Sequence, residues 1–171
     1  KRQVNNVTKD IYPKYNKPTH FVKLGRRKIE RLIKRIGIFR VKAKSIYYLS
    51  KTLVEKYKGK VPSTYAELEQ LPGVGHKTAS VVMSQGFGFP AFPVDTHIHR
   101  LAQRWGLTNG KNVVQTEKDL KKIFPRKHWN KLHLQIIWYG REYSPARGWT
   151  LDKDIITKKI GRKTVLKAYK S

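Results

Sequence analysis

Apolar residues recur along this chain at the spacing of amphipathic helices. Ile29, Leu32, Ile33 and Ile36 lie at positions i, i+3, i+4 and i+7, and Gly37 follows them. This spacing places the four side chains on one face of a helix, and a glycine just past the last of them favours a helix end. The pattern therefore predicts a helix that buries this face and ends near Gly37.

The helical period continues through the rest of the chain. We predict further helices at about 46–57, 64–70, 76–86, 96–105, 113–124 and 130–143, and one more where a sparser apolar pattern precedes Pro13. The segment 130–143 leaves little of its surface polar, so it is expected to form the core of a second lobe. Because no convincing strand alternation appears, the pattern predicts an all-α fold.

One break between helices has the residue types of a tight turn. Gly73 and Gly75 allow backbone conformations closed to other residues, and Pro72 fixes its own φ. Such a turn, running into a helix, is expected to leave its amides free for a phosphate. Lys77 falls in the first helical turn, where the helix dipole and desolvation disfavour an ammonium group and favour a nucleophilic amine. The alternative is an ordinary loop with a solvated lysine.

A second candidate residue lies 18 positions after the lysine. Asp95 precedes Thr96 and His97, and aspartate is a preferred N-cap residue. A capping carboxylate is held in place, so it could also receive a proton in a cleft. The glycine-rich break at 86–90 separates Lys77 from Asp95, which predicts a lobe boundary there and a cleft between lobes that brings the pair together.

The charge of the chain indicates its partner. The sequence has 38 Lys and Arg against 11 Asp and Glu, a net charge of +27. A polyanion is the natural partner, and nucleic acid is favoured over acidic membrane because no apolar run approaches the ~20 residues that span a bilayer.

The absence of cysteine excludes disulfides, thiol nucleophiles and cysteine-ligated metal sites, and no histidine pair has helical metal-ligand spacing. Met83 is the only methionine, so we expect the sequence to be part of a longer product.

At this point the residues resemble a known family. The segment 71–79 is similar to the helix-hairpin-helix of DNA glycosylases related to endonuclease III, and 94–100 resembles the segment that carries their essential aspartate. Segments 36–39, 59–62 and 110–113 resemble further family landmarks in the expected order, so the resemblance covers residues 1 to about 148.

The resemblance implies a two-lobed, all-α helix-hairpin-helix DNA glycosylase fold with the active-site cleft between the lobes. A helical barrel lobe would span residues 1–89 and contain the helix-hairpin-helix at 71–87. A second helical lobe would span residues 90–171 and end in a basic tail, 144–171. That tail is expected either to be solvated and partly disordered or to form a basic strap that packs on the second lobe and touches DNA.

The resemblance also implies a bifunctional glycosylase and apurinic/apyrimidinic (AP) lyase that removes oxidised pyrimidines from duplex DNA. Lys77 would be the nucleophile that forms a Schiff base, and Asp95 would accept a proton or stabilise charge on the sugar. Ile38 would be the apolar wedge that enters the base stack, with a buried loop isoleucine as the alternative. The remaining DNA-binding candidates are Gly73, Val74, Gly75, His76, Thr78 and Arg40. The partner would be double-stranded DNA with damaged bases or abasic sites, bound by a monomer, with a monovalent cation allowed at the hairpin.

Two departures from the family stand out. Most relatives carry four cysteines that bind a [4Fe–4S] cluster, whereas Ser144 stands about where the first would be and no cysteine follows. No cluster is therefore expected, and the tail is expected to take over its structural and DNA-contacting roles. The family also has roughly 40 residues before the point that matches Lys1.

Three other functions stay open on sequence grounds. A monofunctional mismatch glycosylase of the superfamily would usually lack a lysine at position 77, and an 8-oxoguanine lyase would share both Lys77 and Asp95. A helix-hairpin-helix can also serve as a non-catalytic DNA-binding module. With no signal peptide, we expect the cytoplasm or nucleoid of a prokaryote, or the nucleus or an organelle of a eukaryote.

Overall fold

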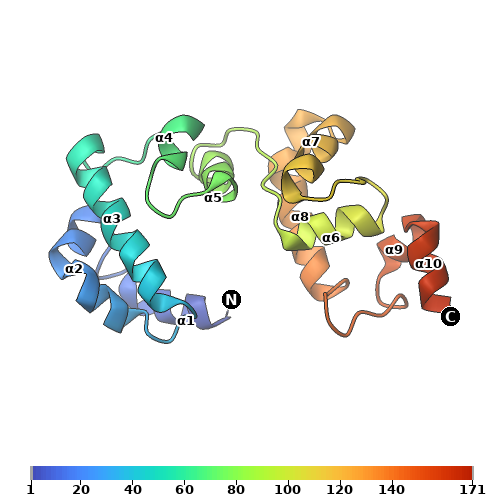
Figure 1. Cartoon of the computed structure of the whole chain (residues 1–171), viewed down its shortest axis with the longest axis horizontal. Helices are drawn as coiled ribbons and strands as arrows, with labels where there is room; N and C mark the ends of the chain where they lie inside the picture. Colours follow the sequence, from blue (N-terminus) through green and yellow to red (C-terminus); the bar gives the residue numbers. More distant parts are fainter. Residues whose placement is uncertain (1, 171) are drawn as a thin grey trace. The chain divides into compact units, whose positions relative to one another are not determined.

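The structure, a computed structural model, describes residues 2–170 and the side chains of residues 3–169, and helices dominate it (Figure 1). No strand occurs in this part of the chain, which confirms the all-α prediction. None of its helices is both long and apolar enough to cross a bilayer. The chain divides into two compact units, Lys1–His76 and Lys77–Ser171. The lobe limits expected from the sequence, 1–89 and 90–171, stay a prediction.

Unit 1 is built around two long helices. Its helices are α1 (Arg2–Ile11), α2 (Pro18–Leu32), α3 (Phe39–Tyr57) and α4 (Tyr65–Glu69). α2 packs along α3, and the buried core between the helices consists of Ile11, Ile29, Ile33, Ile36 and Ala43. Thr64 is the N-cap of α4, and its hydroxyl accepts a hydrogen bond from the Glu67 amide.

The predicted helix end at Gly37 is wrong by one turn. α2 ends at Leu32, and Ile33 and Ile36 lie in the turns that follow, with the Ile36 amide 2.8 Å from the Ile33 carbonyl oxygen. Both side chains are nevertheless buried. The apolar spacing reports which side chains face the core, and a tight turn after the helix can present them almost as the helix would.

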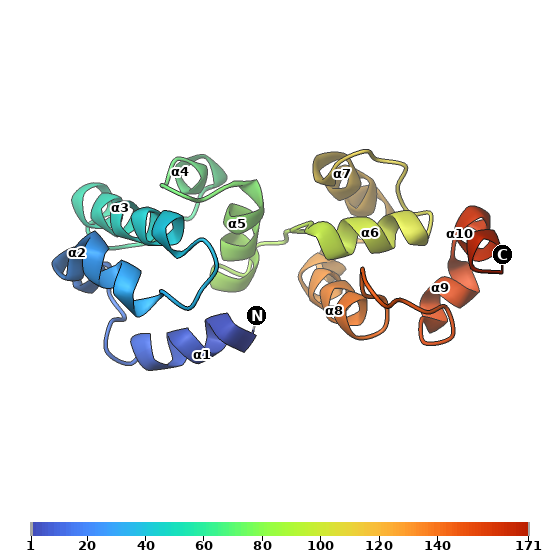
Figure 2. The ribbon, with the colours of Figure 1, turned by 60° about the horizontal axis from the view of Figure 1, so that its bottom comes forward.

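Unit 2 is centred on α6 (Thr96–Arg104), which contacts both α7 (Val113–Ile123) and α8 (Trp129–Glu142) (Figure 2). α5 (His76–Val81) leads into the unit and is followed by a π-helical turn, Val82–Gly86, and a 3-10 turn, Arg126–His128, precedes α8. A Cβ added to Gly140 would lie 3.1 Å from the Leu101 side chain, so α8 approaches α6 closely at this glycine. The core contains Phe92, Val94, Ile98, Leu101, Ala102, Trp105, Leu120 and Ile136.

The helix predicted to form the core of the second lobe, α8, contributes only one face to that core. His133, Ile136 and Gly140 are buried, but Leu134 is 48% exposed and Trp138 59%. The two exposed residues are four apart, so they share one face of the helix. Apolar composition identified the helix but could not say which of its faces is covered.

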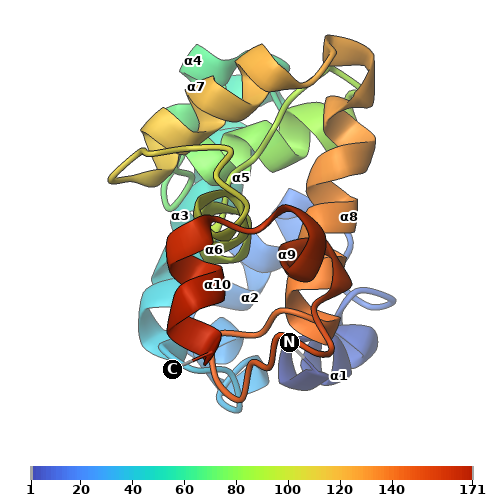
Figure 3. The same cartoon turned by 90° about the vertical axis from the view of Figure 1, so that its right-hand side faces the viewer.

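The C-terminal segment packs on unit 2. α9 (Ile155–Ile160) and α10 (Lys163–Lys170) lie beyond the C-terminal end of α6 (Figure 3). Leu151, Asp154 and Thr157 are buried. The alternative of a solvated, partly disordered tail is therefore wrong for this segment, and the strap that packs on the second lobe is observed; its contact with DNA stays a prediction.

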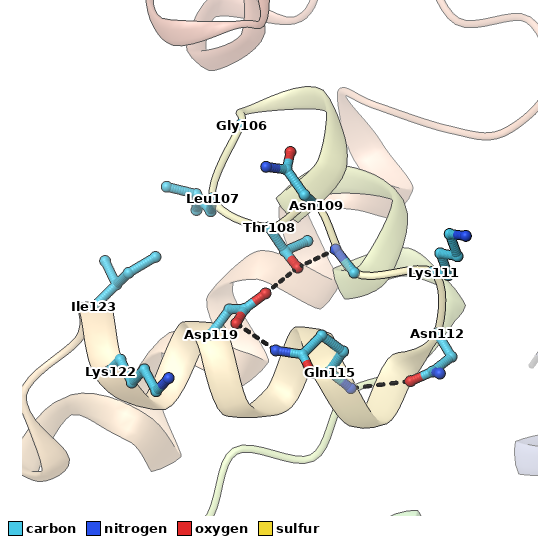
Figure 4. Close-up of a pocket in the computed structure, with 11 residues that line it drawn as sticks. Gly106, Leu107, Thr108, Asn109, Lys111, Asn112, Gln115, Asp119, Lys122 and Ile123 are labelled. Carbon is cyan, nitrogen blue, oxygen red and sulfur yellow. Dashed lines mark hydrogen bonds between the residues drawn. The ribbon is translucent and has the colours of Figure 1, made fainter.

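The loop between α6 and α7 is braced by its own polar groups (Figure 4). It borders a hollow of about 730 Å³. The Thr108 hydroxyl donates to Asp119 at 2.5 Å and accepts from the Gly110 amide, while Gln115 donates to the other Asp119 oxygen at 2.8 Å. Because these groups form hydrogen bonds with one another, the shape of this pocket is set by the loop's own structure.

Candidate active site

The predicted tight turn between α4 and α5 is present. The Leu71 amide donates to Leu68 and the Val74 amide donates to the Leu71 carbonyl oxygen at 3.0 Å. Gly73 has φ of +79°, in the left-handed region that favours glycine. The expectation that every turn amide is free is wrong for Val74, whereas the Gly73 and Gly75 amides donate to no other residue in the described range 2–170.

Replacing Gly73 with alanine should disrupt this turn. A Cβ there would lie 2.7 Å from both the Cβ and the Oγ of Ser45, in addition to the strain of the positive φ. We expect the melting temperature to fall by several degrees and DNA affinity to fall with it. Gly75→Ala is the matched control, because it meets no atom within 4 Å and has no positive φ. Equal melting curves for the two variants would contradict this account of the turn.

Residues on either side of Lys77 are placed differently. The His76 ring is 2.7 Å from a Glu69 carboxylate oxygen and stacks on Tyr65, with 5.6 Å between ring centres. Thr78 is exposed. The Lys77 side chain is half-exposed and opens unit 2. His76 thus already has protein partners, whereas Lys77 and Thr78 are accessible from solvent.

Asp95 has two oxygens with different partners. It is the N-cap of α6, and its Oδ1 accepts hydrogen bonds from the His97 amide at 2.9 Å and the Ile98 amide at 3.0 Å. Its Oδ2 lies 3.5 Å from the Lys77 Nζ. The prediction that Asp95 caps a helix is confirmed, and the structure brings Lys77 and Asp95 together within unit 2. The helix fixes one oxygen and leaves the other for the lysine.

The surroundings keep the Asp95 carboxylate ionised. Its side chain is only 12% exposed, and this burial raises the pKa, but the Ile98 amide and the charge of Lys77 outweigh it, so the pKa lies below the usual value. Asp95 therefore remains an anion throughout the neutral and mildly acidic range.

Two residues beside this pair, the partly buried Arg100 and the buried His133, escaped the sequence analysis. Arg100 on α6 donates to the Gly140 and Ser144 carbonyl oxygens at 3.1 and 2.7 Å. His133 on α8 is 1% exposed, and burial lowers its pKa, so the ring is neutral at pH 7. Spacing could not reveal them. The partners of Arg100 are 40 or more residues away in the sequence, and the neutral state of His133 results from its burial.

Ile38 and Arg40 belong to unit 1, as do the hairpin glycines. Ile38 is 73% exposed and has φ of +56°, a conformation that costs a β-branched residue energy. The alternative of a buried loop isoleucine is therefore wrong. Arg40 is exposed, with its guanidinium 5.6 Å from the Phe39 ring centre. An exposed, strained apolar residue at the start of α3 has the character expected of a wedge.

The residues around Ser144 do not fit the [4Fe–4S] cluster that most relatives carry according to the family resemblance. Ser144 is fully buried, and its hydroxyl accepts a 2.6 Å hydrogen bond from Arg104, a cation that would oppose a metal ion. The sequence has no cysteine to supply thiolates. In residues 2–170, moreover, no group of three or more His, Asp or Glu side chains could hold a metal ion.

Comparison with known proteins identifies the family of the chain. Residues 2–126 match the model of the HhH-GPD superfamily of base excision DNA repair proteins. Endonuclease III of Bacillus subtilis is 42% identical over 84% of this chain and 66% of its own length. The chain thus spans just under two thirds of this relative. Endonuclease III of Escherichia coli K12 is 41% identical over 84% of this chain and 68% of its own length.

Solved structures give the same result. A trapped endonuclease III–DNA covalent intermediate superposes with a TM-score of 0.91 at 36% identity, covering 98% of this chain and 78% of that one. A thermostable thymine-DNA glycosylase is 23% identical with a TM-score of 0.82, a likeness that shows the fold alone. The chain therefore belongs to the helix-hairpin-helix superfamily of base excision DNA repair proteins and, within it, to the relatives of endonuclease III.

Proposed function

We propose that this protein is a base-excision DNA glycosylase with AP lyase activity, and that it removes oxidised pyrimidines from duplex DNA. The observation that carries the proposal is the contact between an accessible lysine and a fixed carboxylate, with 3.5 Å between the Lys77 Nζ and the Asp95 Oδ2. An amine beside a held anion can attack an electrophilic sugar carbon while the anion stabilises the positive charge that develops.

In the proposed reaction, the nitrogen lone pair of neutral Lys77 forms a bond to C1′ of a nucleotide flipped out of the duplex. The bond from C1′ to the base breaks, its electrons leave with the base, and the base takes up a proton. Opening of the sugar ring then gives a Schiff base between Nζ and C1′. Loss of a C2′ proton breaks the C3′–O bond and cuts the strand on the 3′ side, and water releases Lys77 from the sugar fragment.

Asp95 would act chiefly through its charge. Because its pKa is lowered, the carboxylate is a weak proton acceptor in the resting protein. Its negative charge can stabilise the cationic sugar as the base departs. This division of roles requires the Asp95 anion and the Lys77 free amine at the moment of attack.

The DNA contacts follow the same proposal. The free Gly73 and Gly75 amides would hold a backbone phosphate, with or without a bound monovalent cation, and would position the duplex without reading its sequence. Exposed Ile38 would fill the stack when the target base leaves it. A net charge of +27 would give an affinity for DNA that falls steeply with salt.

A panel of labelled duplexes tests the proposal. Each duplex carries one thymine glycol, dihydrouracil, 8-oxoguanine, uracil or abasic site, and strand scission is measured with and without hot alkali. We expect cleavage without alkali at thymine glycol, dihydrouracil and abasic sites, since a lyase cuts without chemical help.

The other outcomes identify the alternatives. Scission at 8-oxoguanine in preference to the pyrimidines would indicate a different base pocket on the same machinery. Scission that requires alkali would indicate a monofunctional glycosylase. DNA binding with no scission at any lesion would contradict the enzyme and favour a binding module.

A further inference from the structure

A second aspartate is more deeply buried than Asp95 and has no part in the proposed reaction. Asp154 has no exposed surface. Its Oδ1 accepts from the Tyr139 hydroxyl at 2.8 Å and the Thr157 amide at 3.0 Å, and its Oδ2 accepts from the Trp149 indole at 2.8 Å and the Thr157 hydroxyl at 2.7 Å. Burial raises the pKa of Asp154, but hydrogen bonds from Ser144, Thr157 and Tyr139 outweigh it and lower the pKa. A buried anion this well satisfied is a built feature of the fold.

The donors come from three successive parts of the C-terminal half. Tyr139 lies in α8, Ser144 and Trp149 lie in the loop after it, and Thr157 lies in α9. One carboxylate therefore draws together a helix, a loop that lacks regular structure and a six-residue helix. Neither the loop nor α9 is long enough to be stable alone, so the segment depends on this centre for its shape.

The same residues hold the C-terminal end of α6. The Trp105 indole donates to the Thr157 hydroxyl at 2.9 Å, and Arg104 donates to the Ser144 hydroxyl at 2.6 Å. The Arg104 guanidinium also lies 4.0 Å from the centre of the Trp149 ring. Farther along the segment, the Arg162 amide donates to the Arg104 carbonyl oxygen at 2.8 Å. We refer to residues 144–162 as the clasp.

The other end of α6 is the site end, because Asp95 is its N-cap. α6 has nine residues, and a helix of this length transmits a shift at one end to the other because its axis is rigid. Arg100, midway along the helix, is bonded to the carbonyl oxygen of Ser144 in the clasp. A displaced clasp would therefore move the carboxylate that faces Lys77.

We propose that Asp154 is a positioning residue, the centre of a metal-free clasp that fixes α6 and so holds Asp95 against Lys77. The clasp occupies the position where the family resemblance places an iron–sulfur cluster, and hydrogen bonds to one buried carboxylate do the work of organising the segment. The structural role of Asp154 in the clasp follows from the contacts alone, whereas its effect on catalysis rests on the proposed function.

The test compares four variants of the full chain by thermal unfolding and by hydrogen exchange of the α6 amides. Asp154→Asn removes the charge and two acceptor pairings, so its melting temperature should fall by roughly 10 °C and α6 should exchange faster. Thr157→Val, which loses the hydroxyl between Asp154 and Trp105, should show a smaller fall, and Thr157→Ser should match wild type. Asp10→Asn is the control, because it makes the same change at an exposed aspartate of unit 1, outside the clasp.

Whether the stability of the wild-type protein depends on a metal ion is tested by its melting curve. Dialysis against a chelator should leave its melting curve unchanged, and a fall in melting temperature after chelation would overturn the metal-free clasp. An Asp154→Asn variant that matches wild type in melting and in α6 exchange would overturn it equally. Both results are independent of any enzymatic activity, so they are distinguishable from a failure of the proposed function.

The positioning role is tested by measuring the rate of base removal at a temperature below the melting temperature of each variant. Asp154→Asn should lower the single-turnover rate of base removal by roughly 10- to 100-fold, because small misplacements of reacting groups are costly, with DNA affinity unchanged. Thr157→Ser should restore what Thr157→Val loses. If α6 loosens while the rate stays at the wild-type value, the clasp is structural only and the positioning role is wrong.

Discussion

Replacing Lys77 with alanine should abolish the covalent adduct that forms when the protein is mixed with abasic-site duplex and borohydride. The reductant traps a Schiff base, and only an amine can form one, so the variant has no group to trap. Strand scission should fall by at least ~10³-fold, as when other enzymes lose their nucleophile. Binding to the same duplex should change little, since one charge among 38 basic residues is removed.

The control for this result is Lys118→Ala, which removes one positive charge from the exposed face of α7. It should form the adduct at the wild-type rate. An adduct of undiminished yield with Lys77→Ala would mean that another amine attacks the sugar, and the assignment of the nucleophile would be wrong.

Replacing Asp95 with asparagine should lower base removal by roughly 10²- to 10⁴-fold, the range for losing a charged group that acts in the transition state. The substitution separates the two roles of the residue. Asparagine is as good an N-cap as aspartate, so α6 should stay folded and DNA should still bind. What is lost is the negative charge 3.5 Å from the Lys77 Nζ. Single-turnover kinetics with a thymine glycol duplex measure the effect.

The effect of this variant should not depend on pH above about pH 5. The pKa of Asp95 is lowered, so the wild-type carboxylate stays charged until the pH falls through that value. Asp95→Ala, which loses the cap as well, should melt earlier than Asp95→Asn by an amount equivalent to about 1 kcal/mol. An Asp95→Asn enzyme with the wild-type rate would remove Asp95 from the mechanism.

Much of this site could be predicted from the sequence because its signals are local. Two glycines in a tight turn and an aspartate before a helix act within a few residues, and the structure has the turn at Gly73 and the cap at Asp95. The helix-hairpin-helix resemblance supplied the roles. The glycine-rich break at 86–90 also predicted that Lys77 and Asp95 come together, and the structure places them in contact. What spacing alone could not supply was the geometry of that contact, which depends on how the segment between them folds.

The rest of the fold depends on interactions that leave no local pattern. Trp105 and Thr157 are 52 residues apart, and in the sequence Asp154 is one of two aspartates in a basic tail. The kink at Gly25, with φ of +71°, and the end of α2 at Leu32 are set by packing rather than by apolar period. The exposed Trp138 shows the same limit, because periodicity identifies an apolar face without saying what covers it.

The central claim is that Lys77 becomes bonded to the sugar, and peptide mass spectrometry of the borohydride-reduced adduct tests it most directly. After nuclease and protease digestion, we predict the mass of the reduced sugar fragment on the peptide that contains Lys77, with fragment ions that place it on that side chain. Modification of another lysine, or unmodified peptide throughout under conditions in which the strand is cut, would contradict the account.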